Sequence, residues 1–106
     1  MNISRLARII ILLGLIVVQG INAEITFVNS QETFDAAHDN SDIGDSIVWR
    51  TGIYSDVFMD IENDHLYIAA EELGKTIFTG ASRVDITSDY ITLKGFQFLD
   101  GDIGTK

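Results

Sequence analysis

Short apolar alternations broken by single turn residues fill the sequence from Ser46 onward, and no helical pattern returns there. They read SIVWR, VFMDI, LYIAA, TIFT, RVDIT, YITLK and FQFL, each only four or five residues long. A β-sandwich usually has longer strands, with turn signals about every 8 to 12 residues. Breaks that come more often than this favour a solenoid, in which the short strands of successive coils stack on one another.

The strands recur at the spacing of one solenoid coil. Ile47, Ile68 and Ile91 lie in comparable strands that are 21 and 23 residues apart. A coil of a parallel β-helix has this size. We therefore predict an all-β chain that forms the first two or three coils of a right-handed parallel β-helix.

Single glycines are expected to mark the corners of the coil. Gly95 lies between the alternations that end at Leu93 and begin at Phe96, and a glycine lets the backbone bend there without a side chain to misplace. The residues expected to point inward are Val84, Ile86, Ile91, Leu93, Phe96 and Phe98. Those expected to face solvent are Arg83, Asp85, Thr92, Lys94 and Gln97.

The first 23 residues have the layout of a secretory signal peptide. Arg5 and Arg8 precede an apolar run of ten residues, Ile9 to Val18, and the small residue Ala23 offers a cleavage site. The alternative is a membrane anchor, but ten apolar residues fall short of the roughly 20 that cross a bilayer. We expect a signal peptide over residues 1–23, a chain that is secreted or periplasmic, and no membrane association after cleavage.

A strand and a helix precede the repeated strands. Glu24 to Val28 alternates apolar and polar residues, which suggests a strand. The helix is predicted from Ser30 to Asp39, with Asn29 or Ser30 as its N-cap. Because a stack of coils exposes its first layer, we expect this helix to act as a terminal cap.

Composition excludes some classes of stabilisation and partner. The chain has no cysteine, so no disulfide is available and packing must stabilise the exported domain. All sixteen acidic residues but only five of the seven basic ones follow Ala23, so this segment has a formal charge of −11. Nucleic acid is not expected as a partner, because phosphate binding needs a basic surface.

Three segments resemble one enzyme family. They are GDSIVWRTGIYSDV (44–57), IAAEELGKTIFTGASRVDI (68–86) and YITLKGFQFLDG (90–101). Each motif is weak alone, but their order and spacing are similar to the N-terminal part of the polysaccharide lyases of the chondroitinase B and alginate lyase type, polysaccharide lyase family 6. The resemblance covers most of residues 34–101. It implies that residues 24–106 are an incomplete, N-terminal part of a parallel β-helix lyase domain.

The resemblance also implies a chemistry. Enzymes of this family cut acidic polysaccharides by β-elimination: calcium and basic groups neutralise the uronate carboxylate, a lysine removes the C5 proton, and an arginine assists near the leaving oxygen. In the family these groups lie on later coils, so no catalytic, cofactor-binding or metal-binding residue is assigned in this chain. The available bases are Arg50, Lys75, Arg83, Lys94 and Lys106.

Acidic residues offer two candidate calcium sites. Asp60, Glu62 and Asp64 alternate and could share a face, although a solvated outer face is the favoured interpretation. Asp100 and Asp102 in DGDIG resemble a single copy of the calcium-binding repeats of other β-rolls, which is weak support.

Other candidate residues have simpler structural interpretations. His38 and His65 lie 27 residues apart without a cysteine, so a zinc site is not expected, and His38 is interpreted as a helix-end residue favoured by the helix dipole. Ser82 lacks a nucleophile-elbow motif and is interpreted as a turn serine. Trp49 and Tyr54 could stack on a sugar, but half-buried strand aromatics are the favoured interpretation.

Three hypotheses follow for the function. The first is an incomplete lyase acting on alginate or chondroitin and dermatan sulfate, inactive by itself because its catalytic coils are missing. It is also expected to be marginally stable, because its last layer, with Phe96 and Phe98, lacks a covering coil. The second is a small, non-catalytic secreted β-solenoid that binds glycans or acts at a surface. The third is an interaction module that pairs its open edge with another chain.

Overall fold

Short strands and one helix wind into a coil over residues 23–99, the part of the chain that the computed structural model describes. The expected signal peptide, except Ala23, and the acidic pair Asp100 and Asp102 lie outside these residues. Within residues 23–99 no helix is long and apolar enough to span a bilayer. The elements are β1 (Ile25–Val28), α2 (Gln31–Asp39), β2 (Ser46–Trp49), β3 (Gly52–Ser55), β4 (Phe58–Ile61), β5 (Leu66–Ala70), β6 (Thr76–Thr79), β7 (Arg83–Ile86), β8 (Ile91–Lys94) and β9 (Phe96–Phe98).

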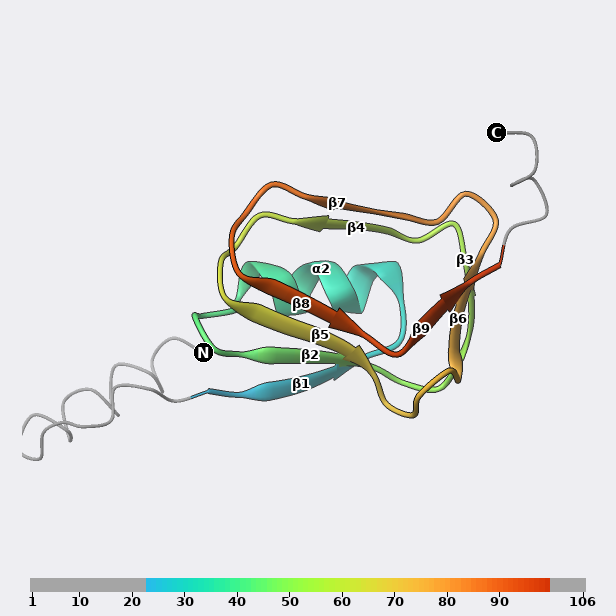
Figure 1. The fold of residues 1–106 in the computed structure, drawn as a ribbon, viewed down its shortest axis with the longest axis horizontal. Helices are drawn as coiled ribbons and strands as arrows, with labels where there is room; N and C mark the ends of the chain where they lie inside the picture. The colour runs from blue at the N-terminus through green and yellow to red at the C-terminus, as the bar shows by residue number, and fades with distance from the viewer. Residues whose placement is uncertain (1–22, 100–106) are drawn as a thin grey trace, which may run out of the picture.

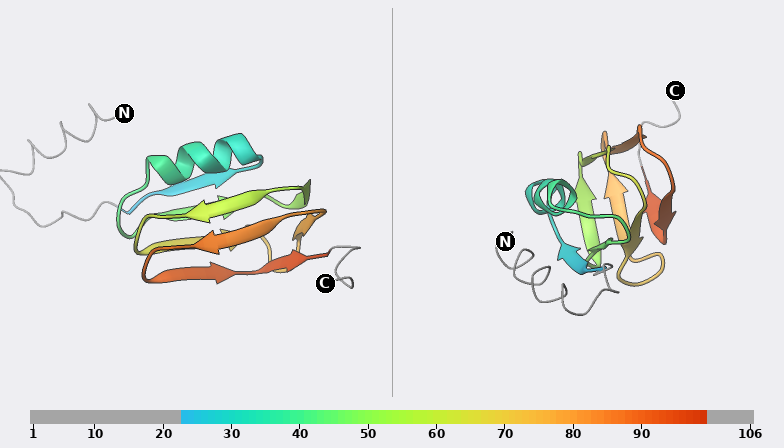
Figure 2. Two further views of the ribbon diagram at one scale, coloured as in Figure 1. Left: turned by 90° about the horizontal axis from the view of Figure 1, so that it is seen from above. Right: turned by 90° about the vertical axis from the view of Figure 1, so that its left-hand side faces the viewer.

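The strands form three parallel sheets around a common interior. Their orders are β1-β2-β5-β8, β3-β6-β9 and β4-β7, and every pair of neighbouring strands is parallel. Each coil therefore contributes one strand to each sheet in turn, as Figure 1 shows. Seen from above, successive coils lie directly against one another (Figure 2). This arrangement confirms the predicted all-β fold of stacked parallel coils.

The register confirms the first predicted repeat and corrects the second. Ile47 pairs with Ile68, which is the predicted spacing of 21 residues. Ile68, however, pairs with Leu93, and Ile91 pairs with Leu66, so the second repeat in this sheet is 25 residues and not 23. The extra length arises because coil corners vary: two residues connect β2 to β3, but five connect β5 to β6.

Two strands differ from the expected pattern of apolar residues. β3 is absent from the series of predicted strands: its Tyr54 points inward, while its apolar neighbour Ile53 is 71% exposed. In β1 the predicted strand is present, but Ile25 and Phe27 are exposed and Val28 is buried. Apolar side chains on the outer face therefore made β3 hard to recognise from the sequence. In β1, they marked the exposed face of the strand instead of the buried one.

The helix α2 closes the first layer of the coil, as predicted. Ser30 is the N-cap, and its hydroxyl accepts a hydrogen bond from the Thr33 N–H while the Thr33 hydroxyl accepts one from the Ser30 N–H, a reciprocal capping box. Phe34 and His38 on the inner face of the helix are buried. Figure 2 shows α2 covering one end of the stack, beside β1.

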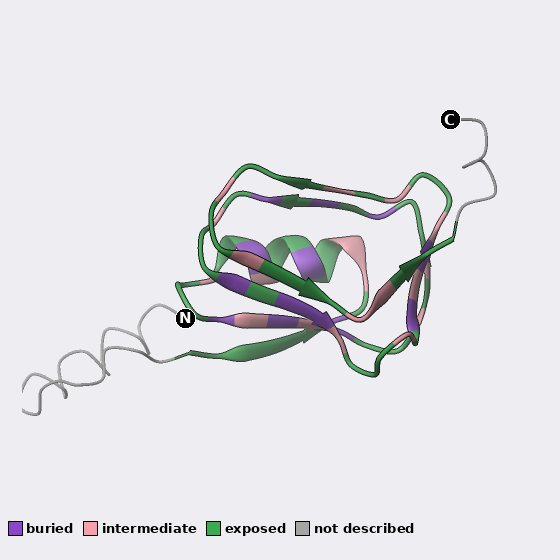
Figure 3. Ribbon diagram, viewed as in Figure 1, coloured by how far each residue is buried: buried purple, intermediate pink, exposed green. Residues whose placement is uncertain are grey.

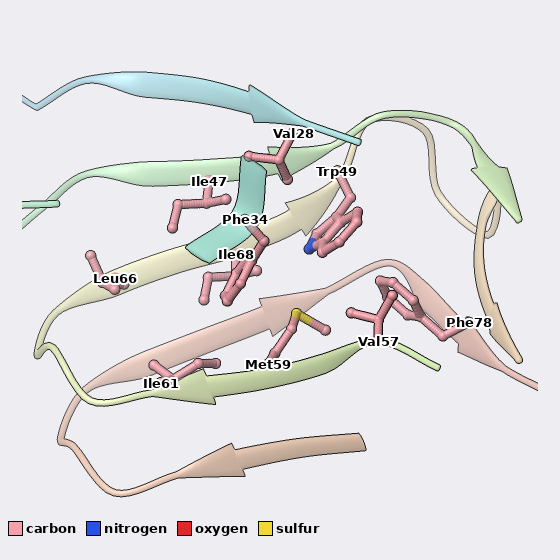
Figure 4. Packing of buried hydrophobic residues seen from close by; sticks show 10 residues of the cluster. All are labelled: Val28, Phe34, Ile47, Trp49, Val57, Met59, Ile61, Leu66, Ile68 and Phe78. Atoms are coloured by element: carbon pink, nitrogen blue, oxygen red, sulfur yellow. The ribbon is translucent and has the colours of Figure 1, made fainter. Parts of the chain in front are cut away.

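Aromatic rings join the helix to the coil interior. The Phe34 ring stacks on Trp49, with 5.7 Å between ring centroids, and Trp49 meets the edge of Phe78 at 5.0 Å. Such pairs stabilise a core beyond the area that they bury. Figure 4 shows this core, which consists of Val28, Phe34, Ile47, Trp49, Val57, Met59, Ile61, Leu66, Ile68 and Phe78.

Glycines lie at corners where the backbone has a positive φ, as expected for Gly95. Gly80 is the corner with the least space: its φ is +69°, and an added Cβ would clash with the Asp56 carboxylate. Gly74 has a φ of +77°, but its nearest neighbour, the Gln97 Nε2, would lie 3.6 Å away from an added Cβ. The two glycines therefore share a backbone conformation and differ in the space around them.

Replacing Gly80 with alanine is expected to lower the free energy of unfolding by about 2–3 kcal/mol, since backbone strain and a steric clash add together. The matched variant Gly74→Ala has only the backbone strain, which costs roughly 1 kcal/mol. Urea unfolding curves of both variants measure the difference. Equal losses would show that the Asp56 contact does not constrain this corner.

Candidate functional site

The two described arginines are held by acidic and aromatic neighbours. Arg50 lies 3.4 Å from the Glu71 carboxylate, and its guanidinium carbon is 4.4 Å from the centroid of the Phe27 ring. Arg83 pairs with Asp85, with 3.3 Å between Nε and Oδ2. All four charged side chains are at least one-third exposed, so these pairs contribute little stability. Both arginines nevertheless have partners within the chain.

The two described lysines do not complete a cationic groove. Lys75 lies exposed in the loop between β5 and β6, and Lys94 lies exposed at the end of β8. Lys106 lies outside the described residues. A site that holds a polyanion and acidifies its C5 proton needs concentrated positive charge. Lys75 and Lys94 are instead separate, exposed side chains on different elements.

The acidic residues of β4 and the following turn lie on the outside of the coil. Asp60 is in register with Asp85, and Asp64 accepts a hydrogen bond from the Asp89 N–H at 2.9 Å. Calcium takes about six to eight oxygen ligands. Within residues 23–99, no three acidic, histidine or cysteine side chains group in a way that could hold a metal ion. Asp60, Glu62 and Asp64 thus do not fit a calcium site, and their placement agrees with a solvated face.

His38 is buried and fastens the helix to the turn after β4. Its Nε2 accepts backbone hydrogen bonds from Glu62 at 3.0 Å and from Asn63 at 3.3 Å. The Asn63 side chain returns a hydrogen bond to the His38 carbonyl at 2.9 Å. An Nε2 that accepts hydrogen bonds carries no proton, so the imidazole is neutral. His38 lies in the last turn of α2, as predicted for a helix-end residue, and its ring is held there by hydrogen bonds.

His65 lies at an exposed corner of the coil. Its ring stacks on Tyr90, with 4.6 Å between ring centroids and 22° between planes. Both residues have a positive φ, 58° and 60°, and the corresponding position one coil earlier is Gly44, with a φ of 92°. These aligned corner residues could not be recognised from the sequence, because His and Tyr rarely adopt the positive-φ conformation that glycine adopts freely.

Ser82 is the turn serine that the sequence predicted. Its hydroxyl donates a hydrogen bond to the Thr79 carbonyl at 2.7 Å and accepts one from the Val57 N–H at 2.9 Å. The second bond joins this corner to the previous coil. The Ser82 hydroxyl thus links two neighbouring coils through hydrogen bonds.

Trp49 and Tyr54 are part of the core and its margin. Trp49 is fully buried, more so than predicted, which leaves no ring face for a sugar. Tyr54 packs at the edge of the core and donates a hydrogen bond from its hydroxyl to the Arg50 carbonyl at 2.8 Å. Burial, with a smaller contribution from the Glu71 carboxylate, raises the pKa of the Tyr54 hydroxyl, against the opposing effect of Arg50. The phenol therefore stays protonated and serves as a donor.

The last strands of the stack, β7, β8 and β9, carry six apolar side chains, which we call the end layer. Each of its side chains is in register with a buried residue of the coil beneath, so all six point inward, as predicted. Yet Ile86, Leu93 and Phe98 remain 37–45% exposed, whereas their partners in the coil beneath are at most 1% exposed. Figure 3 shows β7, β8 and β9 as exposed or intermediate along their whole length, without a buried residue. The pairs are Val84–Met59, Ile86–Ile61, Ile91–Leu66, Leu93–Ile68, Phe96–Thr76 and Phe98–Phe78.

The strands of the end layer also have unpaired backbone edges within the described residues. β7, β8 and β9 each pair with one strand only, on the side of the preceding coil. An open strand edge beside exposed apolar side chains is a ready template for another strand.

Comparison with known proteins agrees with the geometry. The solved structure of AlyGC, an alginate lyase of the PL6 family, superposes with a TM-score of 0.63 and 20% sequence identity. The match covers 71% of this chain but only 11% of AlyGC, and at this identity it establishes the fold. No curated protein matches the chain.

The family model for chondroitinase B matches residues 28–106, which is most of the chain. The match takes in α2, every strand after β1 and the whole end layer. Stacked parallel coils, the likeness to an alginate lyase and this match all lead to the same assignment. The chain belongs to the chondroitinase B family of polysaccharide lyases.

Proposed function

We propose that this chain provides the cap and first coils of an exported polysaccharide lyase, which cleaves uronate-containing acidic polysaccharide by β-elimination. The match to the chondroitinase B family over residues 28–106 is the observation that carries the proposal. Alginate and chondroitin or dermatan sulfate are the candidate substrates. Removal of a signal peptide after Ala23 would deliver the protein to the periplasm or the exterior.

The reaction needs groups that residues 23–99 do not assemble. Removing the proton next to a uronate carboxylate requires a base within hydrogen-bond reach and positive charge that stabilises the developing anion. The described arginines pair with Glu71 and Asp85, and the described carboxylates do not fit calcium. We therefore assign the base, the metal and the substrate groove to coils that stack on the end layer.

Residues 23–99 would form the first coils, on which the remaining coils of the lyase stack. The helix α2 shields the first layer, and the end layer offers three strand edges and a row of inward side chains to the next coil. In-register stacking then fixes where each strand of that coil lies. The positions of catalytic side chains on the later coils would follow from this register.

The purified 106-residue chain is expected to release no unsaturated uronate from alginate or chondroitin, measured as ultraviolet absorbance of the product. A chimera in which residues 24–99 replace the corresponding first coils of AlyGC is expected to fold and to retain alginate cleavage. A second chimera with Ile68→Asp provides a control, because a buried carboxylate in the foundation should abolish folding and activity together. Lyase activity of the 106-residue chain, or a first chimera that cannot fold, would overturn the proposal.

A further inference from the structure

Asp45 is a buried carboxylate that accepts a hydrogen bond from the backbone of Glu24, the residue before β1. Its side chain lies in the turn before β2, and the residue is only 6% exposed. Its Oδ2 accepts a hydrogen bond from the Asp42 N–H at 2.8 Å, and its Oδ1 accepts one from the Glu24 N–H at 2.9 Å. The Asp45 N–H donates back to the Asp42 carbonyl at 3.0 Å, which closes the turn and fixes the carboxylate.

A buried carboxylate is normally matched by a positive charge as well as by hydrogen bonds. The ion pairs formed among residues 23–99 join Arg50 to Glu71 and Arg83 to Asp85. Asp45 is in none of them. Its partner at Glu24 is a peptide N–H, which satisfies the oxygen but supplies no charge.

The backbone nitrogen of Glu24 is also the atom that signal-peptide cleavage would expose. The predicted cut falls between Ala23 and Glu24. Independently, the hydrogen-bonded ladder of the first sheet starts at the same residue, since the Ser46 N–H donates to the Glu24 carbonyl at 2.8 Å. Ala23 itself is exposed. The first described hydrogen bond between β1 and β2 thus involves the residue at which the mature protein is predicted to begin.

We propose that Asp45 is the binding site for the mature N-terminus, and that removal of the signal peptide completes it. A protease of the signal-peptidase class adds water across the Ala23–Glu24 peptide bond, which leaves a carboxylate on Ala23 and an amine on Glu24. The amine takes a further proton at neutral pH, because unpaired α-amino groups have a pKa of about 7.7–8.0. The atom already within hydrogen-bond distance of Oδ1 then becomes an ammonium group.

The charge change fastens the outermost strand of the first sheet after export. The acceptor in this hydrogen bond is already an ionised carboxylate, and an ammonium donor adds the attraction between opposite charges. β1 is held on one side by β2, and it supports the helix α2 that caps the stack. Signal-peptide cleavage therefore stabilises the helix cap in the mature protein. In the precursor, Asp45 faces an uncharged peptide N–H instead. The inference rests on the proposed signal-peptide cleavage and not on the lyase chemistry.

The 106-residue chain, exported from a bacterial host, tests the site. Intact mass and N-terminal sequencing are expected to show that the exported protein begins at Glu24. Acetylation of its α-amine retains one N–H donor but removes the charge, and is expected to raise the unfolding equilibrium constant about tenfold. In the Asp45→Asn variant the same acetylation is expected to have no effect.

A variant with one alanine inserted between Ala23 and Glu24 supplies a control that keeps Asp45. Its ammonium group lies one residue too early, so its α-amine is expected to react with an acylating reagent about tenfold faster than that of the processed protein. A different N-terminus, equal acylation rates, or the same acetylation effect with and without Asp45 would each overturn the proposal. Sugar cleavage enters none of these measurements, so the failure of the lyase proposal would be seen separately.

Discussion

Replacing Trp49 with alanine is expected to lower the free energy of unfolding by about 3–5 kcal/mol. Trp49 is fully buried, stacks on Phe34 of the helix and meets the edges of Tyr54 and Phe78. A domain of this size has a total stability of only about 4–12 kcal/mol. The loss is therefore at least about a quarter of the total, and far-ultraviolet circular dichroism during urea titration would measure it.

The Trp49 prediction has a control on the neighbouring strand. Ile53 is similar in hydrophobicity but 71% exposed, so Ile53→Ala is expected to change stability by about 0.5 kcal/mol or less. Because Trp49 is the single tryptophan of the chain, its fluorescence in the unsubstituted protein reports directly on the core. A loss below 1 kcal/mol for Trp49→Ala would mean that the helix does not pack on the coil interior as described.

The second large effect depends on the layer in which a residue lies. Ile68 and Leu93 occupy the same position in adjacent coils, but Ile68 is fully buried and Leu93 is 37% exposed. Ile68→Ala should cost about 2–5 kcal/mol because it leaves a cavity. Leu93→Ala should cost about 1 kcal/mol, since solvent can occupy the space that the side chain leaves. Urea unfolding of the two variants gives the ratio.

The sequence predicted the fold because its strongest signals were local. Ser30 and Thr33 begin a helix through capping that depends on neighbouring residues. The alternation from Arg83 to Phe98 assigned six inward residues correctly, because side chains in a strand point to opposite faces in turn. Order and spacing of the motifs were then sufficient to suggest the family that the comparisons support.

What the sequence missed depends on contacts between coils. The length of each corner is set by how the next coil aligns, which is why the 25-residue repeat from Ile68 to Leu93 could not be counted from apolar residues alone. The neutral state of His38 follows from two N–H groups that lie 24 and 25 residues away in sequence. The approach of Glu24 to Asp45 depends likewise on the first two strands pairing in one register.

The central claim is that the end layer is an interior surface of a larger coil, and the cost of Leu93→Ala measured in two settings tests it most directly. In the 106-residue chain the cost should stay near 1 kcal/mol, and in the AlyGC chimera, where another coil would cover Leu93, it should rise to about 2–5 kcal/mol. Such a rise, with Ile68→Ala unchanged between the two settings, is the result we predict. An equally small cost of Leu93→Ala in both proteins would contradict the claim.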